Sequence, residues 1–161
     1  DTPTQRVGEA PTKGFQQVEH DYPMLSLSNT YSKEEVADFI QRVEKGLENR
    51  RVDYCVELKM DGVALSLKYE KGKLVRGVTR GNGRRGDEIT ANIKTIASLP
   101  HQLKESITTE VRGEVFIPKK EFIKLNRERE ELGEVPWANP RNAAAGSLKL
   151  LDPKEVAKRR L

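Results

Sequence analysis

The 161-residue chain is rich in charge and poor in core material: 34% of its residues are charged, against about 25% in a typical domain, and 35% are hydrophobic. Its net charge of +4 permits a phosphate-rich partner without requiring one, because 29 basic residues are mixed with 25 acidic ones. The single cysteine excludes an internal disulfide, which suits a reducing cytoplasm, and the presence of only two histidines argues against a His/Cys metal site. No apolar run approaches the roughly 20 residues that a membrane span needs.

The N-terminal stretch DTPTQRVGEAPTKG is polar, lacks the apolar centre of a secretory signal and has no initiator methionine. We therefore expect a segment cut from a longer protein. Turn-forming glycines and prolines predict a surface arm over residues 1–22, which leads into a domain over residues 23–161. The small share of apolar residues predicts a thin core, or one that further chain completes.

The first half of the chain predicts one helix followed by a hairpin. Ser32 can cap the helix in a capping box with Glu35, and apolar residues at helical spacing extend it to Leu47. Alternating residues predict a strand over 54–69, which a turn at Lys71-Gly72 joins to a return strand over 74–79.

The second half predicts further helices around another strand. Asp87 is expected to cap a helix that carries Ile89, Ile93 and Ile96. The other predicted elements are a strand over 109–117 and helices over 119–132, within 135–148 and from Asp152 onward. The predicted fold class is therefore α+β, with mostly antiparallel sheets and flanking helices.

The stretch CVELKMDGVALSLKY, residues 55–69, places three charged side chains on one face of its predicted strand: Glu57, Lys59 and Asp61. An exposed edge strand with an ordinary ion pair explains such a pattern. A lysine between two carboxylates, followed by the flexible Gly62, also suits a pocket in which the lysine acts as a nucleophile. Arg112 and Glu114 form a second charged cluster, on one face of the predicted strand over 109–117.

Two further stretches suggest contacts with phosphate. In RGNGRRGDE, residues 80–88, Arg80 and the backbone around Gly81, Gly83 and Gly86 could meet an anion, although a plain connection explains the same residues equally well. The loop does not match the G-x-x-x-x-G-K-[ST] pattern of a P-loop. In ANPRNAAAGS, residues 138–147, the small residues predict close packing of a helix, and Arg141 is either a phosphate contact or simply exposed.

The residues KMDG, 59–62, resemble the K-x-D-G signature of the nucleotidyltransferases that include DNA ligases, RNA ligases and mRNA capping enzymes. Four longer segments resemble bacterial NAD⁺-dependent DNA ligases in the same order, over nearly the whole chain: PMLSLSNTYS (23–32), ELKMDGVALSLKYEKGKLVRGVTRGNGRRGDEITANIKTI (57–96), VRGEVFIP (111–118) and NPRNAAAGSLKLLDP (139–153). The segments ANPRNAAAGSL and RGDEITANI set that family apart from ATP-dependent ligases. The resemblance implies a covalent nucleotidyltransferase fold of the ligase type, related to ATP-grasp, in a cytoplasmic enzyme of DNA replication and repair.

The resemblance also implies a mechanism and roles. Lys59 would attack the α-phosphorus of NAD⁺, nicotinamide mononucleotide would leave, and AMP would pass from the lysine to the 5′-phosphate of a nick, from which the 3′-OH displaces it. Asp61 would support Lys59, and Mg²⁺ would neutralise the phosphates. The implied nucleotide contacts are Ser26 and Leu27 at the adenine, Glu57 at its amino group, Arg80 at the ribose and phosphate, and Glu114 at the ribose hydroxyls. Arg141 and Lys149 would lie on the phosphate and DNA side.

The chain departs from the family pattern at two positions. Asn82 stands where Asp is common, and Lys149 stands where Arg is usual, which keeps the charge and loses the bidentate fork. The family's later adenylation-domain motifs and its DNA-binding modules are expected beyond Leu161. We expect a monomer that acts on nicked double-stranded DNA and has no membrane partner.

Two alternatives remain open at this point. One is a K-x-D-G nucleotidyltransferase that uses ATP or GTP, of the RNA ligase or capping type. The other is a nucleotide- or DNA-binding module without turnover, which strongly salt-dependent DNA binding without adenylation would indicate.

Overall fold

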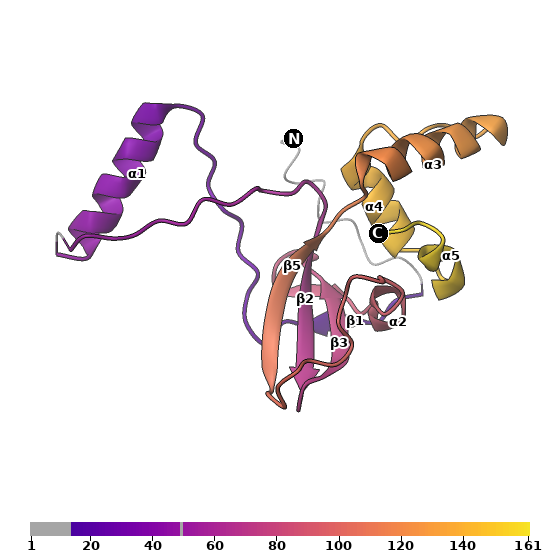
Figure 1. The fold of residues 1–161 in the computed structure, drawn as a ribbon, viewed down its shortest axis with the longest axis horizontal. Coiled ribbons are helices and arrows are strands. Elements are labelled where there is room, and N and C mark those ends of the chain that lie inside the picture. Colours follow the sequence, from indigo (N-terminus) through magenta and orange to yellow (C-terminus); the bar gives the residue numbers. More distant parts are fainter. Residues whose placement is uncertain (1–13, 49) are drawn as a thin grey trace. The chain divides into compact units, whose positions relative to one another are not determined.

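The computed structural model describes residues 14–48 and 50–161, and these form two compact units. The small unit is Leu25–Lys59, and the large unit consists of the described residues up to Met24 together with Met60–Leu161. Figure 1 shows the elements of both units. In the described part of the chain, no helix has the length and apolar character needed to cross a membrane.

The large unit is built on an antiparallel three-stranded sheet of order β3-β2-β5 (Figure 1). Its strands are β2 (Val63–Glu70), β3 (Lys73–Thr79) and β5 (Thr109–Val115). The predicted turn between β2 and β3 is confirmed: Lys71 and Gly72 have φ angles of 48° and 78°, as the two-residue hairpin turns that match strand twist require. A second pairing joins β1 (Gln17–Glu19) to β4 (Arg85–Asp87).

One face of the sheet carries the main core. Leu65, Leu67 and Tyr69 alternate along β2 and are at most 6% exposed. Ile89, Ile93 and Ile96 pack against them from the segment around α2 (Thr90–Ile93), and Leu148 closes the cluster. Burial raises the pKa of Tyr69, whose hydroxyl donates to the carbonyl of Pro100 at 2.8 Å.

The remaining helices of the large unit are α3 (Lys119–Glu131), α4 (Pro140–Leu148) and α5 (Pro153–Ala157). A second, smaller core lies between α3 and α4. Ala143 and Ala144 of α4 pack with Leu125 of α3 and with Trp137. The small residues of α4 therefore allow close packing, as predicted, and Asn139 caps the helix by accepting a hydrogen bond from the N–H of Asn142 at 2.8 Å.

The small unit contains α1 (Lys33–Gly46) and irregular chain on either side of it. The predicted cap is confirmed, because the Ser32 hydroxyl accepts from the N–H of Glu35 at 3.1 Å. The Glu35 carboxylate accepts from the N–H of Tyr31, one residue before the position that a capping box uses. Phe39 meets Tyr54 edge to face, with ring centroids 6.3 Å apart.

Two sequence predictions are wrong. The strand predicted over 54–69 begins only at Val63, so Glu57, Lys59 and Asp61 do not share a strand face. Ladder pairing of β2 begins where Val63 meets Val115, and the alternating residues before it find no strand in the described chain and no core: Val56 and Leu58 are 95% and 89% exposed. The helix predicted from Asp87 to Ile96 also differs: Asp87 lies in β4 and does not cap it, the N-cap position belongs to Ile89, and α2 ends at Ile93.

Candidate functional site

Three cross-strand rows of residues occupy the face of the sheet opposite Leu65 and Leu67. The strand register defines these rows, because residues that pair directly across neighbouring strands share a face. From β3 across β2 to β5 they are Arg76, Lys68 and Glu110; then Val78, Ser66 and Arg112; and finally Arg80, Ala64 and Glu114. Arg80 belongs to the third row because its N–H donates to the carbonyl of Ala64 at 2.9 Å, one residue beyond β3.

The third row contains two of the residues that sequence analysis assigned to the nucleotide. Arg80 and Glu114 stand two strand spacings apart, which is roughly 10 Å, and the small side chain of Ala64 lies between them. An arginine can donate to phosphate oxygens and a carboxylate can accept from hydroxyl groups, so this row offers both kinds of contact that a nucleotide needs.

Gly62 ties the K-M-D-G residues to this row. Its N–H donates to Oε1 of Glu114 at 3.1 Å, and a Cβ at this position would come within 2.0 Å of the Val115 carbonyl oxygen. Only a glycine lets the two backbones approach so closely. The chain leaving Asp61 is thereby fixed against the end of β5.

Asp61 and Arg141 are also brought together. A guanidinium nitrogen of Arg141 lies 3.6 Å from Oδ1 of Asp61, and both side chains are partly exposed, at 45% and 70%. The Asn139 cap and Pro140 place Arg141 in the first turn of α4. Two residues that the sequence assigned to separate roles, one beside the nucleophile and one on the phosphate side, therefore form an ion pair.

The glycine-containing loop after Arg80 is hydrogen-bonded within itself. The N–H groups of Arg84 and Arg85 donate to the side-chain oxygen of Asn82 at 3.0 and 2.8 Å, and the N–H of Gly83 donates to the carbonyl of Arg80 at 2.9 Å. A Cβ on Gly81 would come within 2.0 Å of the Arg85 carbonyl oxygen. These contacts favour the interpretation of the loop as a tight connection over that of a backbone anion cradle.

Arg141 and Lys149, the two residues predicted on the phosphate and DNA side, have different partners: Arg141 pairs with Asp61, and Lys149 pairs with Asp87. The second pair involves a buried carboxylate. The Lys149 ammonium lies 3.6 Å from Oδ2 of Asp87, whose side chain is only 7% exposed. The other carboxylate oxygen of Asp87 is buried without a hydrogen-bond partner in the described chain. Lys149 therefore compensates a buried charge on β4.

Four predicted site residues belong to the small unit: Ser26, Leu27, Glu57 and Lys59. They lie on irregular, exposed chain, where Leu27 is 80% exposed. The thiol of Cys55 lies 3.9 Å from a carboxylate oxygen of Glu57. The large unit thus assembles Asp61, Glu114, Arg80 and Arg141 around the ends of β2 and β5, and the small unit carries the lysine and its flanking carboxylate.

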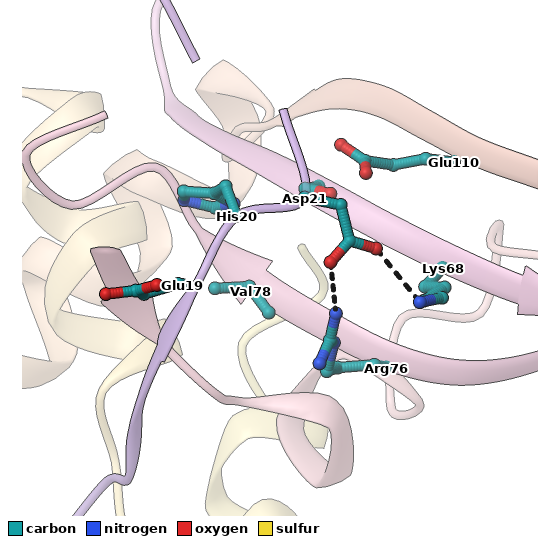
Figure 2. Close-up of a pocket in the computed structure, with 8 residues that line it drawn as sticks. Glu19, His20, Asp21, Lys68, Arg76, Val78 and Glu110 are labelled. Atoms are coloured by element: carbon teal, nitrogen blue, oxygen red, sulfur yellow. Dashed lines mark hydrogen bonds and ion pairs between the residues drawn. The ribbon is translucent and has the colours of Figure 1, made fainter. Parts of the chain in front are cut away.

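Sequence reasoning missed a segment that crosses the same polar face of the sheet. Figure 2 shows Asp21 pointing between Lys68 and Arg76, with Glu19 and His20 beside it. The Lys68 ammonium donates to Asp21 at 2.9 Å, and Arg76 lies 3.6 Å away. The hydrogen bond from Lys68 is the largest of the effects that lower the pKa of Asp21.

Comparison with known proteins matches this chain to one family. A family model described as "NAD-dependent DNA ligase adenylation domain" matches residues 12–161. Among similar proteins, a DNA ligase of Protochlamydia amoebophila is 58% identical over 99% of this chain, which corresponds to 24% of that protein. DNA ligases of Petrotoga mobilis and Fervidobacterium nodosum are each 55% identical over the whole chain, which covers 24% and 23% of their lengths. The chain therefore spans about a quarter of the length of the relatives that it matches.

Proposed function

Because the chain belongs to the family of NAD-dependent DNA ligase adenylation domains, we propose that it performs the adenylation step of an NAD⁺-dependent DNA ligase that seals nicks in duplex DNA. The observation that carries this proposal is the hydrogen bond from Gly62 to Glu114. It joins the K-M-D-G residues to the R-G-E residues, the two charged motifs that would act on one nucleotide. In the cell we place this activity in DNA replication and repair in the cytoplasm.

Lys59 is the proposed nucleophile. Its amine, after losing a proton, attacks the α-phosphorus of the substrate NAD⁺; a phosphorus–nitrogen bond forms as the bond to nicotinamide mononucleotide breaks. In the second step, a 5′-phosphate oxygen at the nick takes the AMP and the lysine amine is released. The 3′-OH then attacks that phosphate, and AMP leaves. Positioning and electrostatic stabilisation account for most of the catalysis in such transfers.

The other residues would orient the substrate. Glu57 would accept from the adenine amino group, and Ser26 and Leu27 would line the adenine. Arg80 and Glu114, on opposite sides of Ala64, would hold the phosphate and ribose sides. The spacing of the third row supports this assignment, because roughly 10 Å between the outer strands leaves room for a ribose.

Asp61 and Arg141 would act beside Lys59 and on the phosphate side. Their ion pair supports a coupled role, since an arriving phosphate could draw Arg141 away and leave Asp61 to support the lysine. Lys149 would contact DNA phosphate at the nick only after its ion pair with Asp87 is broken.

Mg²⁺ fits this site as a partner of phosphate. The described residues offer no group of three or more His, Cys, Asp or Glu side chains arranged to hold a metal. Mg²⁺ commonly binds through substrate phosphates, water and one or two carboxylates, and Glu57 and Asp61 each lie two residues from Lys59. When bound, the ion would neutralise phosphate charge.

We further assign the antiparallel sheet and its helices to the covalent nucleotidyltransferase fold, and we expect the protein to act as a monomer.

The proposal is tested by measuring the mass of the intact chain after incubation with Mg²⁺ and either NAD⁺ or ATP. We expect the native chain to gain the mass of one AMP with NAD⁺ and not with ATP, and we expect no gain in Lys59→Ala. A gain with ATP and not with NAD⁺ would instead indicate the ATP-dependent class. No gain with either nucleotide would mean that this chain at most binds its ligand, without turnover.

A further inference from the structure

A short segment crosses the polar face of the sheet beside the third row. We call residues 19–24 the strap. Its ends are fixed by backbone hydrogen bonds to the loop that follows Arg80: the N–H of His20 donates to the Arg84 carbonyl at 2.9 Å, and the N–H of Met24 donates to the Gly83 carbonyl at 2.8 Å. Met24 is 7% exposed, so the strap is anchored at the point where the large unit gives way to Leu25, Ser26 and Leu27.

The middle of the strap is held by charges from the first two rows. Asp21 bridges Lys68 of β2 and Arg76 of β3, as Figure 2 shows. Arg112 of β5 donates through one guanidinium nitrogen to the carbonyl of Tyr22 at 2.8 Å and through another to that of Pro23 at 3.0 Å. Glu110 lies 3.4 Å from the third nitrogen of the same guanidinium and orients it.

The fork of Arg112 is the main side-chain hold on residues 22 and 23. The Tyr22 side chain is 69% exposed, so its burial does not hold this part of the strap. Pro23 has no N–H to donate. Two carbonyls of adjacent residues need two donors in fixed geometry, which a guanidinium provides and an ammonium does not.

The strap touches the proposed nucleotide row directly at Arg80, and on the other side it contacts Arg112, a neighbour of Glu114 on β5. On the β3 side, Nε2 of His20 lies 3.2 Å from the carbonyl oxygen of Arg80. On the β5 side, Arg112 is two residues from Glu114 on the same face of the strand. A displacement of the strap would therefore reach the main chain of Arg80.

We propose that Arg112 is a positioning residue for the nucleotide: its two-carbonyl contact clamps the strap, and the clamped strap aligns the main chain of Arg80. The clamp is a property of the fold alone, and the positioning role rests on the proposed function. Loss of the clamp weakens nucleotide binding and leaves the attack by Lys59 at saturation largely unchanged.

Hydrogen exchange of the nucleotide-free chain tests the clamp. In Arg112→Lys, we expect the amides of His20 and Met24 to exchange about tenfold faster, because one of two charge-assisted hydrogen bonds is lost, while amides inside β2 keep their rates. Arg160→Lys is the matched control, since it makes the same change at a 71% exposed arginine that pairs with Glu121 at 3.6 Å. Equal exchange in both variants would overturn the clamp.

Nucleotide binding and adenylation test the positioning. We expect the Kd for NAD⁺ to rise several-fold in Arg112→Lys, with the adenylation rate at saturating NAD⁺ within twofold of the native chain. Faster exchange with an unchanged Kd would reduce Arg112 to a structural clamp and overturn its positioning role. If the native chain itself binds no NAD⁺, the proposed function and the positioning role both fail, while the exchange experiment still decides the clamp.

Discussion

The N–H of Gly62 donates to the carboxylate of Glu114 at 3.1 Å across the junction of β2 and β5. The two residues are 52 positions apart in the chain, and each belongs to a separate charged motif. Their contact holds Gly62 against the end of β5, and Asp61 directly precedes Gly62 in the chain.

Gly62→Ala is expected to destabilise the chain strongly. The added Cβ would come within 2.0 Å of the Val115 carbonyl oxygen, and neither backbone can move without breaking the strand pairing. We expect a loss of about 3 kcal/mol in the free energy of unfolding, measured with urea. Gly113→Ala, on the paired strand, is the control: apart from its two chain neighbours, no residue has an atom within 4 Å of the added Cβ. Equal stabilities of the two variants would contradict this account of Gly62.

Lys149→Arg is expected to stabilise the chain. The buried Asp87 carboxylate has one oxygen 3.6 Å from Lys149 and one without a partner in the described chain. A guanidinium can donate to both oxygens of a carboxylate, so we expect a gain of about 1 kcal/mol.

The urea midpoints of Lys149→Arg and of a surface control measure this gain. Lys124→Arg is suitable, because Lys124 forms an exposed pair with Glu128 at 3.6 Å and the change should leave stability within about 0.5 kcal/mol. A urea midpoint of Lys149→Arg at or below that of the native chain would show that a second donor to the Asp87 carboxylate adds no stability.

Asp21→Asn is expected to change how stability depends on pH. Lys68 and, to a smaller extent, Arg76 lower the pKa of Asp21 below its ordinary value. A carboxylate with a lowered pKa stabilises the folded state fully above that ordinary value, and the stabilisation is lost as pH falls through the folded-state pKa. Because the side chain is 46% exposed, the effect should stay below about 1 kcal/mol.

Unfolding free energies of the native chain and Asp21→Asn, measured across the acid range, check this sign. The native chain should be the more stable near neutral pH, and the difference should shrink below about pH 4. A difference that grows on acidification would mean that Lys68 and Arg76 do not stabilise the charged form of Asp21.

Local signals in the sequence predicted the elements that depend on neighbouring residues. Ser32 caps α1, Lys71 and Gly72 form the hairpin turn, and Arg112 and Glu114 share a face, as expected. The strand predicted from residue 54 failed because alternation describes a strand only where another strand pairs with it, and pairing of β2 begins at Val63. Asp87 does not cap a helix because it lies in β4, where it pairs with Gln17 of β1, a partner 70 positions away that no local signal reveals.

The site was predictable in its residue types and less so in its contacts. The resemblance to NAD⁺-dependent DNA ligases identified Lys59, Asp61, Arg80 and Glu114 as site residues through their motifs. The strap gave no comparable signal, because the hydrogen bonds from Arg112 to Tyr22 and Pro23 span about 90 positions and end on backbone carbonyls, which no side-chain pattern reveals.

The central claim is that Lys59 carries the AMP, and peptide mapping after incubation with NAD⁺ and Mg²⁺ tests it most directly. Fragmentation of the modified peptide should place one AMP on Lys59, within residues 57–62, and the adduct should disappear in Lys59→Ala. An AMP located on another lysine, or one that persists in Lys59→Ala, would contradict the account.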